Sequence, residues 1–149
     1  MKIEEAIKQE KFRDEFEKAN INLLYTANWM NNNLHQIIKS YDISMQQFNI
    51  LRILRGQKGK PAPLKLLTER MLDKMSNTSR LVDKMLLKGL LERQICSDNR
   101  RQVDIILTEK GLKSCQILSE IIDKHRNSIQ RITENEAREL NRILDKMRS

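Results

Sequence analysis

The side chains best suited to a chemical task lie around one predicted helix in the middle of the chain. Its periodicity predicts a helix from about Lys74 to Lys88, with Asp73 as N-cap and Gly89 as C-cap glycine. One face carries an apolar stripe, formed by Leu81, Val82, Met85 and Leu86. Off that stripe, near the N-terminal end, stand short polar residues and one long cation: Ser76, Asn77, Ser79 and Arg80. On the open face of an anchored helix, these groups can hydrogen-bond to base edges and phosphates in a DNA major groove.

Two adjacent arginines follow at the tip of a predicted β-hairpin. Two short runs of apolar, β-forming residues, 90–95 and 103–107, flank the sequence SDNRR. Ser, Asp and Asn suit a turn, and this turn presents Arg100 and Arg101, which suit a narrow, electronegative minor groove. Over residues 63–108 the order of helix, turn, helix, glycine, strand, basic tip and strand is that of a winged helix-turn-helix.

The net positive charge is concentrated in the same segment. Lysine and arginine outnumber aspartate and glutamate by 13 to 5 over residues 52–101, a net charge of +8, which equals the value for all 149 residues. Residues 1–51 carry −1 and residues 102–149 carry +1. A basic patch of this size supplies affinity for nucleic acid through counterion release.

Each of these features also has a plainer interpretation. Arg100 and Arg101 could form a solvated hairpin tip, and the polar residues of the predicted helix could be an ordinary solvent-facing surface. Four further cations are more often solvated than engaged in specific contacts, although each could touch a phosphate: Lys65, Arg70, Lys74 and Lys84.

Composition favours one mostly helical globular domain. The length allows a sizeable core, and no apolar run approaches the roughly 18–20 residues that span a bilayer. Only 4 Gly and 2 Pro occur, which favours long helices. The charged N-terminus, MKIEEAIKQEKF, lacks the apolar core of a secretory signal, so we expect a cytoplasmic protein.

No catalytic, metal or cofactor site is indicated. Cys96 and Cys115 are interpreted as inert thiols rather than as a redox switch, and His35 and His125 stand alone. The chain has no phosphate-cradling glycine loop, no nucleophile elbow and no carboxylate pair with a plausible cleft. The sequence therefore predicts no enzyme, no metal and no cofactor.

Long amphipathic helices are predicted on both sides of the winged segment. Residues 5–39 keep helical periodicity without a breaker, and about 28 residues of helix would be about 42 Å long, too long for a small domain to cover alone. This length suggests a partner subunit, most simply in a symmetric dimer. A group of aromatic and methionine side chains could line a ligand pocket, or could simply belong to the core: Tyr25, Trp29, Met30 and Met45.

Helix starts are marked by local signals. Ser44 and Gln47 form a capping box for a helix that ends at Gly56, and Pro63 falls in the first turn of the next helix after the loop GQKGKPAP. Later starts carry similar signals, at Thr108 and at Thr133 with Glu136. The predicted order is α-α-α-α-β-β-α-α.

Two motifs, SRLVDKMLLKGLLER (79–93) and NRRQVDIILTEKG (99–111), resemble the MarR (multiple-antibiotic-resistance regulator) family of bacterial winged-helix repressors. In that family the first is the recognition helix with its glycine stop, and the second is the wing returning to a Leu-Thr-x-x-Gly helix start. The resemblance implies a homodimer bound to a pseudo-palindromic operator. It places recognition contacts on Ser76–Arg80, Thr78 included, and a minor-groove arginine on Arg101.

Two positions depart from the family pattern. The family often has Asp two residues before the minor-groove arginine, where this chain has Asn99; either Asp98 orients the arginine instead, or the arginine is less rigidly held. The family also often has Gly in the helix-turn-helix turn, where this chain has Leu72.

We therefore expect a single MarR-like domain over residues 1–149. Residues 44–108 would form the DNA-binding lobe, and residues 5–39 and 109–148 a helical dimerisation region. The expected function is sequence-specific, double-stranded DNA-binding transcriptional regulation by a homodimeric repressor that responds to a small-molecule effector. The alternative is a winged-helix protein–protein interaction module whose basic patch binds an acidic partner.

Overall fold

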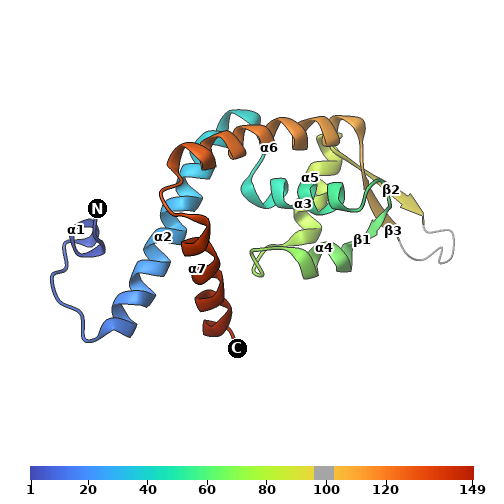
Figure 1. The fold of residues 1–149 in the computed structure, drawn as a ribbon. Helices are drawn as coiled ribbons and strands as arrows, with labels where there is room; N and C mark the ends of the chain where they lie inside the picture. Colours follow the sequence, from blue (N-terminus) through green and yellow to red (C-terminus); the bar gives the residue numbers. More distant parts are fainter. Residues whose placement is uncertain (96–102) are drawn as a thin grey trace.

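The computed structural model describes residues 1–95 and 103–149. In chain order its elements are α1 (Ile3–Ile7), α2 (Glu15–Ile38), the 3-10 helix η1 (Lys39–Tyr41), α3 (Met45–Gly56), β1 (Ala62–Pro63), α4 (Leu64–Arg70), α5 (Thr78–Leu87), β2 (Leu91–Ile95), β3 (Val103–Leu107), α6 (Glu109–Ile129) and α7 (Glu134–Met147). In Figure 1, α3, α4, α5 and the sheet form a lobe, α2 and α7 form an arm beside it, and α6 runs across the lobe to the arm. The predicted class, mainly α with a β-hairpin wing, is confirmed. Within the described ranges no helix is both long and apolar enough to cross a membrane.

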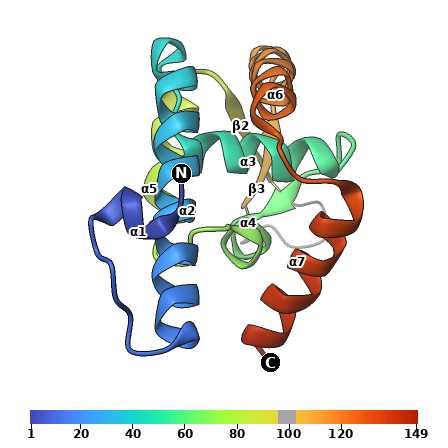
Figure 2. The same ribbon diagram turned by 60° about the vertical axis from the view of Figure 1, so that its left-hand side comes forward.

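The N-terminal region departs from the single helix predicted over residues 5–39. After α1 the backbone of Lys8 is left-handed, with φ of 54°, and α2 begins only after Asp14, whose side chain caps its first turn. The short helix folds back onto α2, where the Nζ of Lys18 lies 2.6 Å from the Oε1 of Glu4 (Figure 2). The prediction of one unbroken helix is wrong at this break.

Two predicted capping boxes are confirmed. The Oγ of Ser44 accepts a hydrogen bond from the Gln47 N–H at 3.1 Å, and the Oε1 of Gln47 accepts one from the Ser44 N–H at 3.1 Å. The helix that they start, α3, ends at Gly56 as predicted. The same reciprocal arrangement joins Thr133 and Glu136 at the start of α7.

The sheet has three antiparallel strands in the order β1-β3-β2, one more than the predicted hairpin. β2 and β3 pair along their whole length, as predicted, and β1 adds Ala62 opposite Ile105. Pro63, predicted in the first turn of a helix, ends β1 and is the N-cap of α4. The extra strand therefore ties the chain before α4 to the strand that returns from the wing.

The hydrophobic core lies inside the lobe and continues under α6. Its largest fully buried side chains are Ile38, Ile50, Leu51, Leu67, Met71, Met85 and Leu118. Leu118 and Cys115 come from α6, so the first half of that helix is packed on the lobe while its second half belongs to the arm. The helix α6 therefore connects the arm to the lobe.

Candidate nucleic-acid interface

The exposed polar helix predicted from the sequence is α5, and Asn77 is its N-cap. The Oδ1 of Asn77 accepts a hydrogen bond from the Arg80 N–H at 3.0 Å, which satisfies one of the free N–H groups of the first turn. The predicted start, with Asp73 as N-cap, is wrong by about one helical turn. Aspartate and asparagine are both favourable N-cap residues, and the N-cap of α5 is Asn77.

The turn before α5 is held by side-chain hydrogen bonds. The Oδ1 of Asp73 accepts from the Met75 N–H at 3.0 Å, and its carbonyl accepts from the Ser76 N–H at 3.2 Å. The Oδ1 of Asn49, in α3, accepts from the Leu72 N–H at 2.9 Å. Leu72, which stands where the family often has glycine, is not in a left-handed conformation. The turn is thus fixed to α3 without a glycine.

The two sides of α5 differ as a recognition helix requires. Thr78, Val82 and Met85 face the core, whereas three predicted contact residues are exposed: Asn77, Ser79 and Arg80. Thr78 is only 4% exposed and Ser76 is half-buried, and neither hydroxyl oxygen has a hydrogen-bond partner among the described residues. The expectation that Thr78 contacts DNA is therefore corrected, because its side chain points into the core rather than to solvent.

Cations surround this exposed side. Arg70, Arg80 and Lys84 are exposed, and within residues 1–95 and 103–149 none of them pairs with a carboxylate. Lys65 lies 3.9 Å from the Oε1 of Glu69, with both side chains in solvent. Such an exposed pair is weak, so its lysine stays available to another anion. The surface around α5 thus presents uncompensated positive charge.

The predicted wing arginines lie outside the described residues. Arg100 and Arg101, with Cys96, belong to the segment 96–102. The strands on either side of that segment are described, and their last pair joins Ile95 to Val103. The antiparallel base of the predicted hairpin is therefore confirmed, and the roles of the two arginines stay a prediction.

A close approach of backbone to backbone joins α5, the sheet and α6. Gly89, with φ of 68°, ends α5 as the predicted C-cap glycine. The hydroxyl of Thr108 donates to the Gly89 carbonyl at 2.7 Å and accepts from the Gly111 N–H at 3.0 Å, so Thr108 is the predicted cap of α6. A Cβ on Gly111 would lie 2.1 Å from the carbonyl oxygen of Leu90. The Leu-Thr-x-x-Gly motif therefore has a packing role at this junction.

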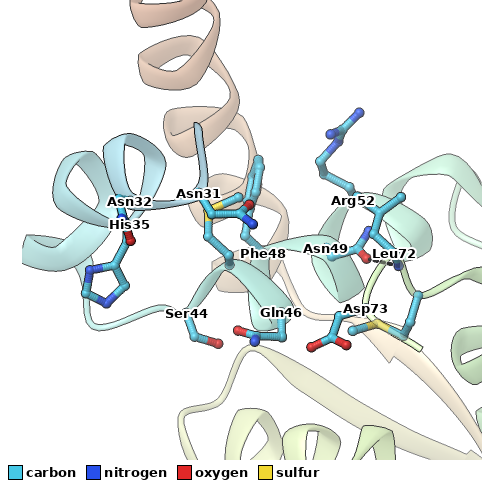
Figure 3. Close-up of a pocket in the computed structure, with 12 residues that line it drawn as sticks. Asn31, Asn32, His35, Ser44, Gln46, Phe48, Asn49, Arg52, Leu72 and Asp73 are labelled. Atoms are coloured by element: carbon cyan, nitrogen blue, oxygen red, sulfur yellow. Dashed lines mark hydrogen bonds between the residues drawn. The ribbon is translucent and has the colours of Figure 1, made fainter. Parts of the chain in front are cut away.

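A cavity of about 490 Å³ lies between α2, α3 and the turn before α5. Figure 3 shows side chains from all three segments around it. Its lining combines amide and charged side chains with apolar ones. The residues include His35, Asn49, Arg52, Asp73, Phe48 and Leu72. Asn49 and Leu72 both line the cavity, and the hydrogen bond between them fixes the turn before α5. The cavity therefore lies directly beside this hydrogen bond.

The predicted ligand-pocket residues are only partly placed at this cavity. Met45 lines it. Tyr25, Trp29 and Met30 do not; they are 39%, 45% and 49% exposed on α2. The prediction named aromatic residues of α2, whereas this cavity is lined by the polar residues Asn31, Asn32 and His35 of that helix; the ligand site itself stays a prediction. A usable signal was the helical spacing of Asn31, Asn32 and His35, which places them on one side of α2 near its C-terminal end.

The remaining candidate residues offer little reactivity. Cys115 is fully buried, and burial raises the pKa of its thiol. In the part of the chain that the structure describes, no three His, Cys, Asp or Glu side chains come together as they would to hold a metal ion. Neither feature provides a chemical centre that competes with the surface around α5.

The helix-turn-helix of α4 and α5, backed by the three-stranded sheet and α6, defines a winged helix-turn-helix protein. A model of the MarR family matches residues 43–103, and transcription regulators match most of the chain. Over residues 43–103 the chain is therefore similar to the MarR family, and the relatives that it matches are named as transcription regulators.

Three relatives illustrate the similarity. The HTH-type transcriptional regulator PecS of Dickeya dadantii (strain 3937) is 28% identical over 118 residues, which cover 76% of this chain and 70% of PecS. The HTH-type transcriptional repressor IacR of Pseudomonas putida is 24% identical over 136 residues, 89% of this chain and 80% of IacR. The organohalide-sensing regulator RdhR-CbdbA1625, in its 2,4-dichlorophenol-bound form, has a TM-score of 0.79 at 23% identity, over 94% of this chain and 85% of that one.

Proposed function

We propose that this chain is a sequence-specific regulator of transcription that binds a pseudo-palindromic operator in double-stranded DNA as a homodimer. The observation that carries the proposal is the exposed face of α5, where Asn77, Ser79 and Arg80 stand on a helix fixed by its cap and its buried side. Amide, hydroxyl and guanidinium groups read base edges and phosphates, and the surrounding net charge of +8 supplies the sequence-independent part of the affinity. Such a regulator acts on the chromosome, hence in the cytoplasm.

Arg101 supplies a minor-groove contact in this proposal, with Arg100 beside it. The variant Arg101→Ala should weaken operator binding by roughly 1–3 kcal/mol, measured by anisotropy on a duplex selected from a random library. Lys60→Ala is the control, because it removes one positive charge from an exposed side chain outside both α5 and the proposed dimerisation region. Equal operator affinities of the two variants would show that Arg101 contributes only through net charge. The assignment of the wing to the DNA interface would then be wrong.

The homodimer rests on apolar side chains that the arm leaves in solvent. They include Phe16 and Leu24 on α2 and, on one face of α7, Leu140, Ile143 and Met147, which are 43–49% exposed. Residues 5–39 and 109–148 would form the dimerisation region. The variant Ile143→Asp should sediment as a single chain of 17.7 kDa and the wild type at twice that mass. Leu87→Asp, in the lobe, is the control; a dimeric Ile143→Asp protein would contradict this interface.

Ligand response would act through the cavity between arm and lobe. A molecule held there would change the separation of the two recognition helices, which must stand about one DNA turn apart, ~34 Å, to read both half-sites. IacR is named a repressor and RdhR-CbdbA1625 is described with 2,4-dichlorophenol bound, and both support a ligand-responsive repressor.

Effector binding in the cavity can be tested with a variant whose larger side chain fills it. The variant Met45→Trp would occupy its apolar part, while Met45 stays away from the exposed face of α5. A panel of small aromatic compounds, beginning with 2,4-dichlorophenol, would be tested for release of the selected duplex. A compound that releases the wild type should fail on Met45→Trp. Equal release from both proteins would place effector binding elsewhere.

A further inference from the structure

The turn before the recognition helix exposes two large apolar side chains. Met75 is 92% exposed and Leu72 is 83% exposed, although both precede a helix whose apolar residues, apart from Leu87, are buried or partly buried. Single exposed apolar residues are common on protein surfaces, so exposure alone assigns no role. What distinguishes Met75 is how its backbone is held and what surrounds it.

The backbone of Met75 is fixed rather than loosely extended into solvent. Its N–H donates to the Oδ1 of Asp73 at 3.0 Å, and the following N–H, that of Ser76, donates to the Asp73 carbonyl at 3.2 Å. Asn49 secures the start of the same turn through the Leu72 N–H. Because these bonds set the direction of the Cα–Cβ bond, the side chain of Met75 is presented to solvent by the fold itself.

Charged groups of both signs flank Met75: the Asp73 carboxylate accepts its N–H, and Lys74 and Arg80 carry positive charge on either side of it in the sequence. Lys74 precedes it, its ammonium donating to the Glu69 carbonyl at 2.6 Å, and Arg80 stands in the first turn of α5. An exposed apolar side chain on a segment with a net charge of +8 suits a partner that is polyanionic yet carries apolar groups. The DNA major groove is such a surface, because thymine places its C5-methyl group there between the phosphate backbones.

We propose that Met75 packs against the C5-methyl group of a thymine in each half-site and is a specificity-determining residue. This inference rests on the proposed DNA-binding function. It assigns to the thioether side chain a part of the sequence readout that the polar residues Asn77, Ser79 and Arg80 do not supply. Leu87, at the opposite end of α5, is 89% exposed and offers a matched apolar residue outside the turn.

The test is a double-mutant cycle between the side chain and the methyl group. After a binding site is selected from a random duplex library, each thymine of a half-site is replaced in turn by deoxyuridine, which removes only the methyl group. Affinities are measured for the wild type, Met75→Ala and Leu87→Ala. At one position the replacement should weaken wild type and Leu87→Ala roughly fourfold in one half-site, and roughly sixteenfold in both, from the burial of one methyl group per site.

The same replacement should leave the affinity of Met75→Ala unchanged. Equal losses in wild type and Met75→Ala at every position would overturn the inference and leave DNA binding intact. A Met75→Ala protein with wild-type affinity for the unmodified duplex would also overturn it and would direct attention to a protein partner for this side chain. Failure of the wild type to enrich any duplex would instead refute the proposed function. Unchanged thermal unfolding would establish that Met75→Ala is folded.

Discussion

Replacing Gly111 with alanine is expected to push α6 away from the C-terminal end of α5. The added Cβ would lie 2.1 Å from the Leu90 carbonyl oxygen, 3.0 Å from its carbon and 3.2 Å from the Cδ2 of Leu107. The Leu90 carbonyl cannot turn aside easily, because it accepts a hydrogen bond from the Thr108 N–H at 3.2 Å. Relief therefore needs a displacement of about 1 Å between two backbone segments, and we expect a cost of about 3 kcal/mol, at the upper end of overpacking effects.

Thermal unfolding followed by circular dichroism, at one fixed protein concentration, measures this cost. At roughly 2–4 °C per kcal/mol for a chain of this size, Gly111→Ala should lower the Tm by roughly 6–12 °C. Gly56→Ala is the control, because a Cβ there meets no atom within 4 Å, and it should change stability by less than about 1 kcal/mol. A Tm for Gly111→Ala that matches the control would refute the argument that this glycine is required by the junction.

Two further predictions concern the recognition helix and the buried thiol. The variant Asn77→Ala should destabilise the protein by about 1 kcal/mol in urea unfolding, whereas Asn77→Asp should retain most of the cap; equal effects of the two would argue against capping by the side-chain oxygen. In a Cys96→Ser background, Cys115 should react with a thiol reagent only on unfolding, and fast reaction of the native protein would contradict its burial. Because the pKa of Cys115 is raised in the folded state, its contribution to stability is full below the pKa of the unfolded thiol and declines as the pH rises through the folded pKa.

The parts of the fold that could be predicted are those whose signals are local. The Ser44–Gln47 and Thr133–Glu136 capping boxes each lie within four residues, and the caps at Thr108 and Gly89 are equally short-range. Their hydrogen bonds form within one turn, so tertiary context changes them little. The exposed face of α5 was predictable for the same reason, since helical periodicity separates it from the apolar stripe.

The parts that could not be predicted depend on contacts between distant segments. The two-residue strand β1 exists only because β3 lies beside it. The break before Asp14 is accompanied by the ion pair between Glu4 and Lys18, which periodicity does not reveal. The cavity combines α2, α3 and the turn before α5, so its lining could not be read from the sequence of α2 alone. The N-cap of α5 is Asn77 rather than the predicted Asp73, and Thr78, directly after the cap, packs into the core, a contact that periodicity does not reveal.

The most direct test of the account is selection from a random duplex library, followed by anisotropy titration of the enriched site at several salt concentrations. A homodimeric operator-binding regulator should enrich a pseudo-palindromic site and bind it as one dimer, at least ~10³-fold more tightly than a scrambled duplex, with an affinity that falls steeply as salt rises. Recovery of no enriched sequence, with weak and equal binding to every duplex, would contradict this function. The basic surface around α5 would then belong to an interaction with an acidic protein partner.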